Sequence, residues 1–359
     1  MNILVVGPSW VGDMVMAQTL FICLKQQHPG CNIDVLAPDW SRPLLERMPE
    51  VREALGFPLG HGVFDLATRR RIGKQLKGQY DQAILLPNSL KSALTPFFAA
   101  IPKRTGWKGE MRYGLLNDLR ILDKERYPLM IERFMALAYD KNAELPKPYP
   151  RPHLVAEEQN RDAALQAFKL STAQPVLALC PGAEFGEAKR WPAAHYAVVA
   201  EQKIREGWQV WIFGSAKDHS GGEEIRNALI PGLREEATNL AGQTSMAQAI
   251  DLMSCATAVV SNDSGLMHVA AALDVPLVAI FGSSTPEHTP PLALPERVAV
   301  LYLGIKCSPC FERTCKYQHL RCLTEISPAS VMQALDGLGV SVGAGAGVGV
   351  EAGASRPAS

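Results

Sequence analysis

The sequence predicts an α/β protein of two doubly wound domains, each a parallel sheet with helices on both faces. Short runs of apolar, largely β-branched residues alternate with longer segments of helical period, which is typical of parallel sheets buried on both sides. A chain of 359 residues is also long enough for two domains of ordinary size. Finally, a proline-rich stretch at 145–152 divides the apolar runs into two series.

Each domain is expected to contribute its own series of strands. The first domain should span residues 1–150, and the second should span residues 151–338. Four prolines in the stretch between them interrupt helix and sheet alike, so we interpret it as a linker. The expected strands are 3–6, 33–37 and 83–86 in the first domain, and 176–180, 209–213, 258–261, 277–281 and 298–303 in the second.

The end of the second domain carries helix-start signals. A last helix is expected over residues 326–338, because Ser327 can cap it and Pro328 suits the first helical position. Residues 339–359 are then a tail rich in Gly, Ala and Val, which we expect to be disordered and without function.

Charge is balanced overall but not along the chain. The sequence has 36 Lys and Arg against 36 Asp and Glu, yet residues 1–150 carry 20 basic and 15 acidic side chains. The excess gathers at 69–77 and 103–112, which indicates either a surface for an anionic partner or solvated helix faces. Nucleic acid is disfavoured, because this domain lacks the high pI, the interleaved aromatic residues and the recognisable motif of nucleic-acid binders.

The sequence also predicts a cytoplasmic protein. It has no run of about 18 uncharged apolar residues that could span a bilayer. The N-terminus lacks a basic region and runs directly into an expected strand and a glycine turn, which is unlike a signal peptide. In the cytoplasm, its eight cysteines should be thiols or metal ligands.

The loop after the first strand presents a carboxylate. Ligands of open parallel sheets bind at the carboxyl ends of the strands, and this loop has Gly7 and Gly12 in a Gly-x4-Gly spacing, followed by Asp13. A phosphate-binding P-loop needs Lys and then Ser or Thr here, and the dinucleotide fingerprint Gly-x-Gly-x-x-Gly is also absent. Asp13 is therefore either a general base facing an interdomain cleft or an acid favoured by the helix dipole.

Two loops of the second domain offer charged groups. Lys189 and Arg190 precede a Trp-Pro pair that opens a helix, and cations beside a helix N-terminus favour a phosphate. An ordinary surface loop would explain them equally well. Asp218, in the next strand-to-helix turn, could bind ribose hydroxyls or cap the helix that follows.

A third loop of the second domain leads into a small apolar helix. Asp263 or Ser264 can cap this helix, so that the amides of Ser264 and Gly265 face an anion. His268 lies one turn further on, at the same end of the helix. A capped core helix containing a buried, hydrogen-bonded histidine is the alternative interpretation.

Four cysteines follow the last expected strand. The first two are spaced as in structural zinc sites, whereas the later spacings are not. We therefore expect reduced structural thiols in a compact loop and no metal, and stoichiometric zinc in the purified protein would reverse this expectation. The four are Cys307, Cys310, Cys315 and Cys322.

Taken together and in this order, the Gly-x4-Gly-Asp, Lys-Arg-Trp-Pro and Asp-Ser-Gly-x-x-His motifs resemble those of glycosyltransferase family 9, the ADP-heptose:lipopolysaccharide heptosyltransferases. The segment 87–92, Pro-Asn-Ser-Leu-Lys-Ser, and the cysteine segment extend the resemblance, which covers about residues 1–338. The family implies a GT-B architecture, in which two Rossmann-like domains face each other across a cleft. The acceptor then binds the N-terminal domain, and the nucleotide sugar binds the C-terminal domain.

The resemblance also implies roles for individual residues. Asp13 matches the base, and Lys189 matches the lysine at the donor phosphates, so both would be catalytic. The remaining donor-binding positions are Asp218 at the ribose and Asp263, Ser264, Gly265 and His268 at the diphosphate and heptose. The implied acceptor-binding positions are Gly12, Asn88, Ser89 and Lys91.

The implied reaction is an inverting transfer of heptose from ADP-heptose, with no obligatory cofactor or metal. The acceptor would be the lipid-linked, anionic lipopolysaccharide core that already carries one heptose. A peripheral contact with the cytoplasmic face of the inner membrane is a further expectation, through the basic residues 69–77 together with Trp107 and residues 97–98. The alternatives are a family member with another core acceptor and a non-catalytic nucleotide-sugar-binding protein.

Overall fold

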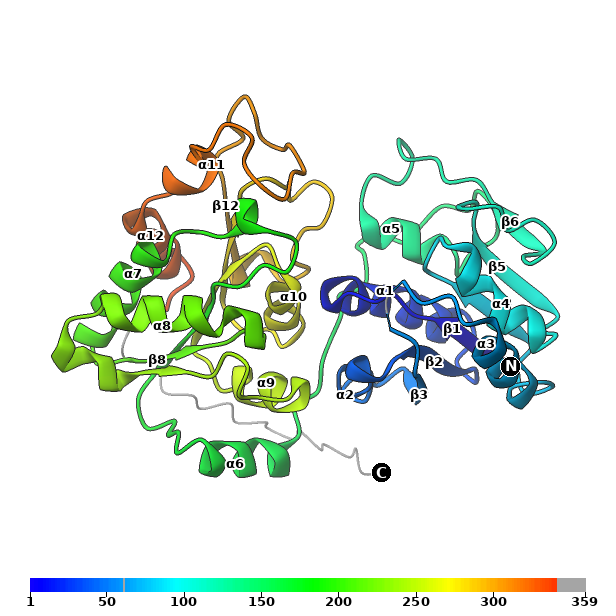
Figure 1. Ribbon diagram of the computed structural model, residues 1–359, viewed down its shortest axis with the longest axis horizontal. Helices are drawn as coiled ribbons and strands as arrows, with labels where there is room; N and C mark the ends of the chain where they lie inside the picture. Colours follow the sequence, from blue (N-terminus) through cyan, green and yellow to red (C-terminus); the bar gives the residue numbers. More distant parts are fainter. Residues whose placement is uncertain (61, 341–359) are drawn as a thin grey trace, which may run out of the picture.

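The computed structural model describes residues 1–60 and 62–340, in which two six-stranded parallel sheets form two separate lobes (Figure 1). The N-terminal sheet has the order β3-β2-β1-β4-β5-β6, and the C-terminal sheet has the order β12-β11-β10-β7-β8-β9. In each sheet, successive strands are first added on one side of the first strand and then on the other. This change of side falls between β1 and β4 in the N-terminal sheet and between β7 and β10 in the C-terminal sheet. Such a switch point is where an open α/β sheet binds its ligand.

The N-terminal lobe contains the strands and helices up to residue 135. Its strands are β1 (Asn2–Val6), β2 (Asn32–Pro38), β3 (Val51–Phe57), β4 (Gln82–Leu85), β5 (Lys103–Trp107) and β6 (Asp118–Arg120). Its helices are α1 (Val11–Gln27), α2 (Arg42–Leu45), α3 (Leu66–Gln75), α4 (Leu90–Phe98) and α5 (Met130–Met135).

The C-terminal lobe repeats this plan. Its strands are β7 (Val176–Cys180), β8 (Gln209–Ile212), β9 (Ala237–Asn239), β10 (Ala258–Asn262), β11 (Leu277–Phe281) and β12 (Val298–Tyr302). Its helices are α6 (Glu158–Ala167), α7 (Ala193–Arg205), α8 (His219–Ala228), α9 (Met246–Met253), α10 (Gly265–Ala272), α11 (Arg321–Thr324) and α12 (Pro328–Gly337).

All eight strands expected from the sequence are present, with ends that differ by one residue at most. Within the described ranges, β3, β5, β6 and β9 were not expected. β3 is an edge strand with several exposed side chains, and β6 and β9 have three residues each. Short or half-exposed strands lack the continuous apolar run that identifies a buried one.

The C-terminal end of the described chain departs slightly from expectation. Ser327 caps α12 as predicted, and its hydroxyl accepts a hydrogen bond from the Ser330 amide at 3.1 Å. Val340, which the sequence assigns to the tail, is buried in the apolar core of the C-terminal lobe. The folded part therefore continues past the expected boundary at residue 338, and the rest of the predicted tail, 341–359, lies outside the described residues.

Helix α1 joins the two lobes. Its sequence is apolar on every side, and its residues from Met14 to Phe21 are all buried. A helix that is apolar all round must be covered all round, and α1 lies between the N-terminal sheet and α10 of the other lobe (Figure 1). One continuous hydrophobic cluster therefore crosses the domain boundary. Across residues 1–60 and 62–340, none of the helices is both long and apolar enough to cross a membrane.

Candidate active site

A cleft of about 580 Å³ lies between the two lobes, at the carboxyl ends of β1, β7, β8 and β10. Residues 9–13 and Trp40 form its N-terminal wall, and loops of the C-terminal domain form the opposite wall. Most of the residues singled out by the sequence line this one cleft. These are Gly12, Asp13, Lys189, Asp218, Asp263, Ser264, Gly265 and His268.

Asp13 lies in the first turn of α1. Burial in the cleft raises the pKa of its carboxyl from the ordinary 3.8 to about 6, and the positive charge of Lys189 opposes this rise. The two side chains therefore interact electrostatically across the cleft. A carboxylate with this pKa is mostly ionised at neutral pH and is more basic than an exposed aspartate, which suits a proton acceptor.

Lys189 ends a short 3-10 turn, Glu187–Lys189, on the opposite wall. Its Nζ donates to Asp263 Oδ2 at 2.5 Å, and the Ser284 hydroxyl donates to the same oxygen. The ammonium also lies 5.1 Å from the centre of the Phe185 ring. Asp263 is buried, whereas 17% of the Lys189 side chain is exposed. The Asp263 carboxylate thus fixes the position of the ammonium group, while part of the Lys189 side chain stays accessible from the cleft.

The N-terminus of α10 forms the floor beside this pair. Ser264 is the N-cap residue, but its side chain makes no capping hydrogen bond, and the Asp263 carboxylate is bound to Lys189 and Ser284. The expectation that Asp263 or Ser264 caps this helix is therefore wrong. Amides of the first turn are left without a side-chain cap at a helix end that carries partial positive charge, as anion binding requires.

Two glycines bring α1 and α10 together at the base of the cleft. A Cβ atom on Gly12 would lie 2.8 Å from His268 Cδ2, and one on Gly265 would lie 2.6 Å from Val11 Cβ. His268 is buried here, and burial lowers the pKa of its imidazole from 6.5 to about 4, with Asp263 opposing and Lys189 adding to the effect. The imidazole is thus neutral at physiological pH. Gly12 and Gly265 are required for the close approach of the two domains.

Asp218 is engaged by the turn in which it lies. Its Oδ2 accepts hydrogen bonds from the Ser215 amide at 2.9 Å and the Ser215 hydroxyl at 2.7 Å. Its Oδ1 accepts from Arg190 Nη2 at 3.3 Å. These contacts make Asp218 the third residue of a capping box that begins at Ser215, and its side chain makes no capping hydrogen bond to α8. The expectation that Asp218 caps the helix that follows is therefore wrong, and its position on the cleft wall leaves ribose binding as a prediction.

The residues expected at the acceptor are only partly brought together. Ser89 and Lys91 line a second, smaller cavity of about 90 Å³ in the N-terminal domain, and Ser9 lines both cavities. Asn88 lies outside both linings, and its carbonyl oxygen accepts from the Glu110 amide at 3.1 Å. Gly12 lies at the domain contact described above.

Several cleft residues were not identified from the sequence. Trp10 lies within the Gly-x4-Gly loop, and the others come from segments without a recognisable motif; these others are Trp40, Thr244, Ser245, Met246 and Thr289. The two tryptophans could have been predicted from the sequence, because large aromatic side chains shortly after expected strands are candidates for ligand contacts. Trp10 and Trp40 are 47% and 40% exposed.

Part of the basic excess in the N-terminal domain has a structural role. Arg69 is buried and donates to the carbonyls of Phe64 at 2.6 Å and Val63 at 2.8 Å, and Arg112 is buried and donates to the carbonyl of Pro87 at 2.8 Å. Trp107 is also buried. The expectation that Arg69 and Trp107 contact lipid is therefore wrong, because neither side chain reaches the surface.

The four clustered cysteines lie in and beside the loop between β12 and α11, and all are free thiols. Burial raises the pKa of Cys322 to about 11, and the nearby thiols add to this rise. Within the two described ranges, no three His, Cys, Asp or Glu side chains are arranged to hold a metal ion. The expected absence of zinc stays a prediction, which metal analysis of the purified protein tests. The loop is tied to Lys189, because the amide of the adjacent Ala188 donates to the Arg313 carbonyl at 3.1 Å.

Two Rossmann-like domains that face each other across a cleft form the GT-B architecture of glycosyltransferases. Residues 69–321 match glycosyltransferase family 9 (heptosyltransferase). The chain belongs to this family.

Known proteins similar to this chain agree with that assignment. It is 52% identical over 344 residues to lipopolysaccharide heptosyltransferase 2 of Salmonella typhimurium, covering 94% of this chain and 98% of the relative. It is 56% identical over 301 residues to lipooligosaccharide heptosyltransferase 2 of Haemophilus influenzae, covering 82% and 86%. The solved structure of E. coli ADP-heptose lipopolysaccharide heptosyltransferase II superposes with a TM-score of 0.84 at 49% identity, covering 94% and 98%.

Proposed function

We propose that this protein transfers L-glycero-D-manno-heptose from ADP-heptose to the first heptose of the lipopolysaccharide inner core. The observation that carries the proposal is the pairing of Asp13 and Lys189 across one cleft, in a chain similar over 94% of its length to heptosyltransferases of type 2. The donor is taken from the E. coli structure at 49% identity, which is that of an ADP-heptose heptosyltransferase.

The residues of the two walls divide the chemistry between them. Asp13 accepts the proton of the acceptor hydroxyl as the hydroxyl oxygen attacks the anomeric carbon of the heptose. The bond from that carbon to the diphosphate breaks in the same step, and ADP leaves with inversion at the carbon. Lys189 and the N-terminus of α10 stabilise the negative charge that develops on the diphosphate. Because these groups neutralise the leaving group, the proposed reaction requires no obligatory metal.

The donor and the acceptor are assigned to opposite walls. The diphosphate lies at Ser264 and Gly265, and the ribose lies toward Asp218, so the nucleotide occupies the C-terminal domain. The acceptor approaches from the N-terminal domain. The smaller cavity of that domain, which Ser89 and Lys91 line, adjoins the cleft, because Ser9 lines both. This division supports a single displacement with one base.

A donor and acceptor screen tests the proposed function. We expect ADP release and heptose transfer with ADP-heptose and an acceptor bearing one heptose, and little transfer from UDP- or GDP-sugars. Equal or faster transfer to a core acceptor bearing no heptose, or bearing two, would reassign the acceptor. Tight binding of ADP-heptose without ADP release in the presence of every acceptor would support the non-catalytic alternative.

We also propose that the α3 face contacts the anionic surface of the membrane that holds the acceptor, on its cytoplasmic side. Arg70, Arg71 and Lys74 are exposed along α3, and the side chains of Phe64 and Leu66 are exposed at its N-terminal end. Basic groups next to exposed apolar side chains are suited to anionic lipid headgroups, at about 1 kcal/mol for each basic residue near the surface.

Liposome sedimentation checks this contact. We expect binding to vesicles containing anionic lipid, weaker binding at high salt, and loss of binding in the triple variant Arg70→Glu, Arg71→Glu, Lys74→Glu. The matched control is Lys124→Glu, Lys141→Glu, Lys169→Glu, which makes the same change of charge at exposed positions elsewhere. Equal loss in both triple variants, or binding that salt does not weaken, would contradict a specific electrostatic contact through α3.

A further inference from the structure

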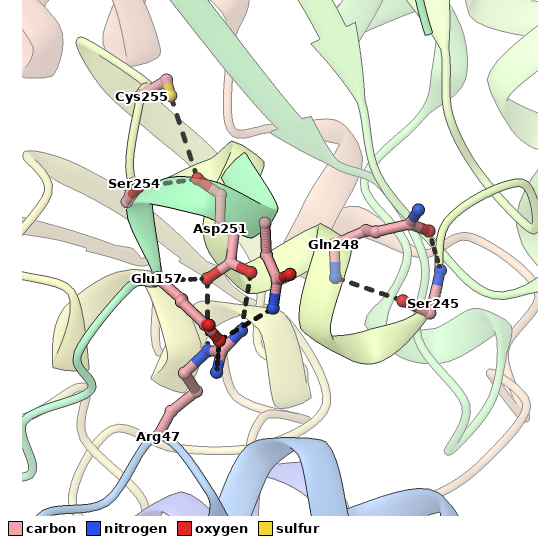
Figure 2. Close-up of polar contacts among 8 residues, drawn as sticks. Arg47, Glu157, Ser245, Gln248, Asp251, Ser254 and Cys255 are labelled. Carbon is pink, nitrogen blue, oxygen red and sulfur yellow. Dashed lines mark hydrogen bonds and ion pairs between the residues drawn. The ribbon is translucent and has the colours of Figure 1, made fainter. Parts of the chain in front are cut away.

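An ion cluster whose central pair, Arg47 and Asp251, is buried connects the two domains (Figure 2). Arg47, which follows α2 in the N-terminal domain, donates from Nε to Asp251 Oδ1 at 3.2 Å and from Nη2 to Asp251 Oδ2 at 2.7 Å. Its third nitrogen, Nη1, donates to Glu157 Oε2 at 2.8 Å. Asp251 belongs to α9 of the C-terminal domain and is fully buried, and the Arg47 side chain is 9% exposed. A two-pronged ion pair therefore crosses the domain boundary.

The chain segment that connects the domains is hydrogen-bonded to both of them at this point. His153 exchanges hydrogen bonds with the Gln18 side chain of α1, at 2.7 and 2.9 Å. The next amide, that of Leu154, donates to the Ala272 carbonyl at the end of α10 at 2.9 Å, and the Val155 amide donates to the Arg47 carbonyl at 3.0 Å. Successive residues thus bind alternate domains.

The Glu157 amide completes this alternation by donating to Asp251 Oδ1 at 2.9 Å. Asp251 therefore accepts from the N-terminal domain through Arg47 and from the connecting segment through Glu157. The carboxylate is the point at which both domains and the segment between them meet.

Helix α9 leads from this cluster to the donor wall. Its eight residues rise about 12 Å, and the residues at its start, Thr244, Ser245 and Met246, line the cleft. Ser245 caps the helix by accepting from the Gln248 amide at 3.2 Å (Figure 2). A displacement of Asp251 relative to Arg47 would therefore shift a rigid helix whose other end forms part of the cleft.

We propose that Arg47 and Asp251 are positioning residues, which hold the donor-binding wall in register with Asp13 by fixing α9 to the N-terminal domain. This inference rests on the proposed function, because it assigns the donor to one wall and the base to the other. Arg47 lies on the domain of the base, and Asp251 lies on the domain of the donor. The pair therefore sets the distance between the Asp13 carboxylate, which accepts the proton, and the anomeric carbon of the bound donor.

The chemistry of the pair fits geometric control better than a contribution to stability. Taking two charges out of water costs about as much as their attraction returns, so a buried pair can often be replaced by apolar side chains without loss of stability. The planar guanidinium fork, in contrast, fixes the direction and distance of a carboxylate through two parallel hydrogen bonds. Lysine keeps the charge but cannot reproduce that geometry.

Two variants test the proposal, and one variant is their control. Arg47→Lys keeps the charge and removes the fork, and the double variant Arg47→Met, Asp251→Leu leaves no buried charge unpaired. Each should lower kcat by about tenfold to a hundredfold, as expected for a displacement of about 1 Å. Donor affinity, measured without acceptor, should stay within about twofold of the wild type, because the donor site lies within one domain.

The control is Arg52→Lys. Arg52 forms the same two-pronged pair with the buried Asp34, donating from Nε to Oδ1 at 2.9 Å, but both residues belong to the N-terminal domain. Its kcat should stay within about twofold of the wild type, even if its melting temperature falls as far as that of Arg47→Lys.

The outcomes separate clearly. Wild-type kcat in both Arg47 variants, a loss of donor affinity as large as the loss of kcat, or an equal loss of kcat in Arg52→Lys would overturn the positioning role. If Arg47→Lys fails to fold, the apolar double variant decides the question alone. The proposed function is judged on the wild-type protein: failure to transfer heptose from ADP-heptose would refute that function, whatever the variants do.

Discussion

Asp13→Asn should lower turnover by ~10²–10⁴-fold while donor affinity stays close to that of the wild type, as expected when a general base is removed. The amide has nearly the same shape as the carboxyl but cannot accept the proton of the acceptor hydroxyl. Asp13→Ala should behave in the same way. Steady-state kinetics with both substrates, together with calorimetric titration of ADP-heptose, measure the two quantities separately.

The pH dependence of the wild type gives an independent reading of the same side chain. Because the pKa of Asp13 in the ligand-free protein is raised to about 6, kcat/KM should rise with pH through that value and level off above it. The Asp13→Asn variant should lose this rise of activity on the acid side of the pH profile (the acid limb). The folded protein holds this proton more tightly than the unfolded chain does, so ionisation of Asp13 costs stability as the pH rises from 3.8 to about 6. At pH 7 the Asn variant should therefore unfold at the same or a higher temperature.

The control for Asp13→Asn is Glu46→Gln. Glu46 is an exposed carboxylate of the same domain, outside the cleft, and its neutralisation should leave turnover unchanged. A collapse of donor affinity in Asp13→Asn, or an acid limb that persists in it, would remove the carboxylate from the role of base.

The buried parts of the fold could be predicted from the sequence, because burial on both faces produces an uninterrupted apolar run. β7 and β11 were therefore expected with their observed ends. β3 and β5 could not be found in this way, because charged residues interrupt the apolar run of each, and their place in the sheet follows from backbone pairing with neighbouring strands. Such strands are specified by a partner distant in the sequence, which a local pattern does not contain.

Cleft residues could be predicted from the sequence where a loop after an expected strand combines glycine with a charged residue. Asp13 and Lys189 follow expected strands and are brought to one cleft, because the carboxyl ends of the strands in both sheets open toward it. The interdomain contacts were not predictable. Nothing near Arg47 in the sequence indicates a partner at Asp251, 204 positions later, and nothing near Gly12 indicates its close contact with His268 of the other domain.

Lys189→Ala should weaken binding of ADP-heptose by about tenfold to a hundredfold, as expected for a charged hydrogen bond, and it should lower turnover as well. Removal of the ammonium takes away a cation from the donor wall. It also leaves Asp263, buried and bound to the Ser284 hydroxyl, without its countercharge. The uncompensated carboxylate would then repel the diphosphate. Lys306→Ala is the control, because Lys306 is an exposed lysine of the same domain outside the cleft lining, and its loss should leave donor affinity unchanged.

The double variant Lys189→Met, Asp263→Asn separates these two effects, because it removes the cation and the buried negative charge together. If Lys189 binds the diphosphate directly, the double variant should bind ADP-heptose weakly, although it regains the stability lost in Lys189→Ala. Recovery of wild-type donor affinity would instead mean that Lys189 serves only to neutralise Asp263. In that case the N-terminus of α10 alone would hold the diphosphate, and the leaving-group role of Lys189 would be wrong.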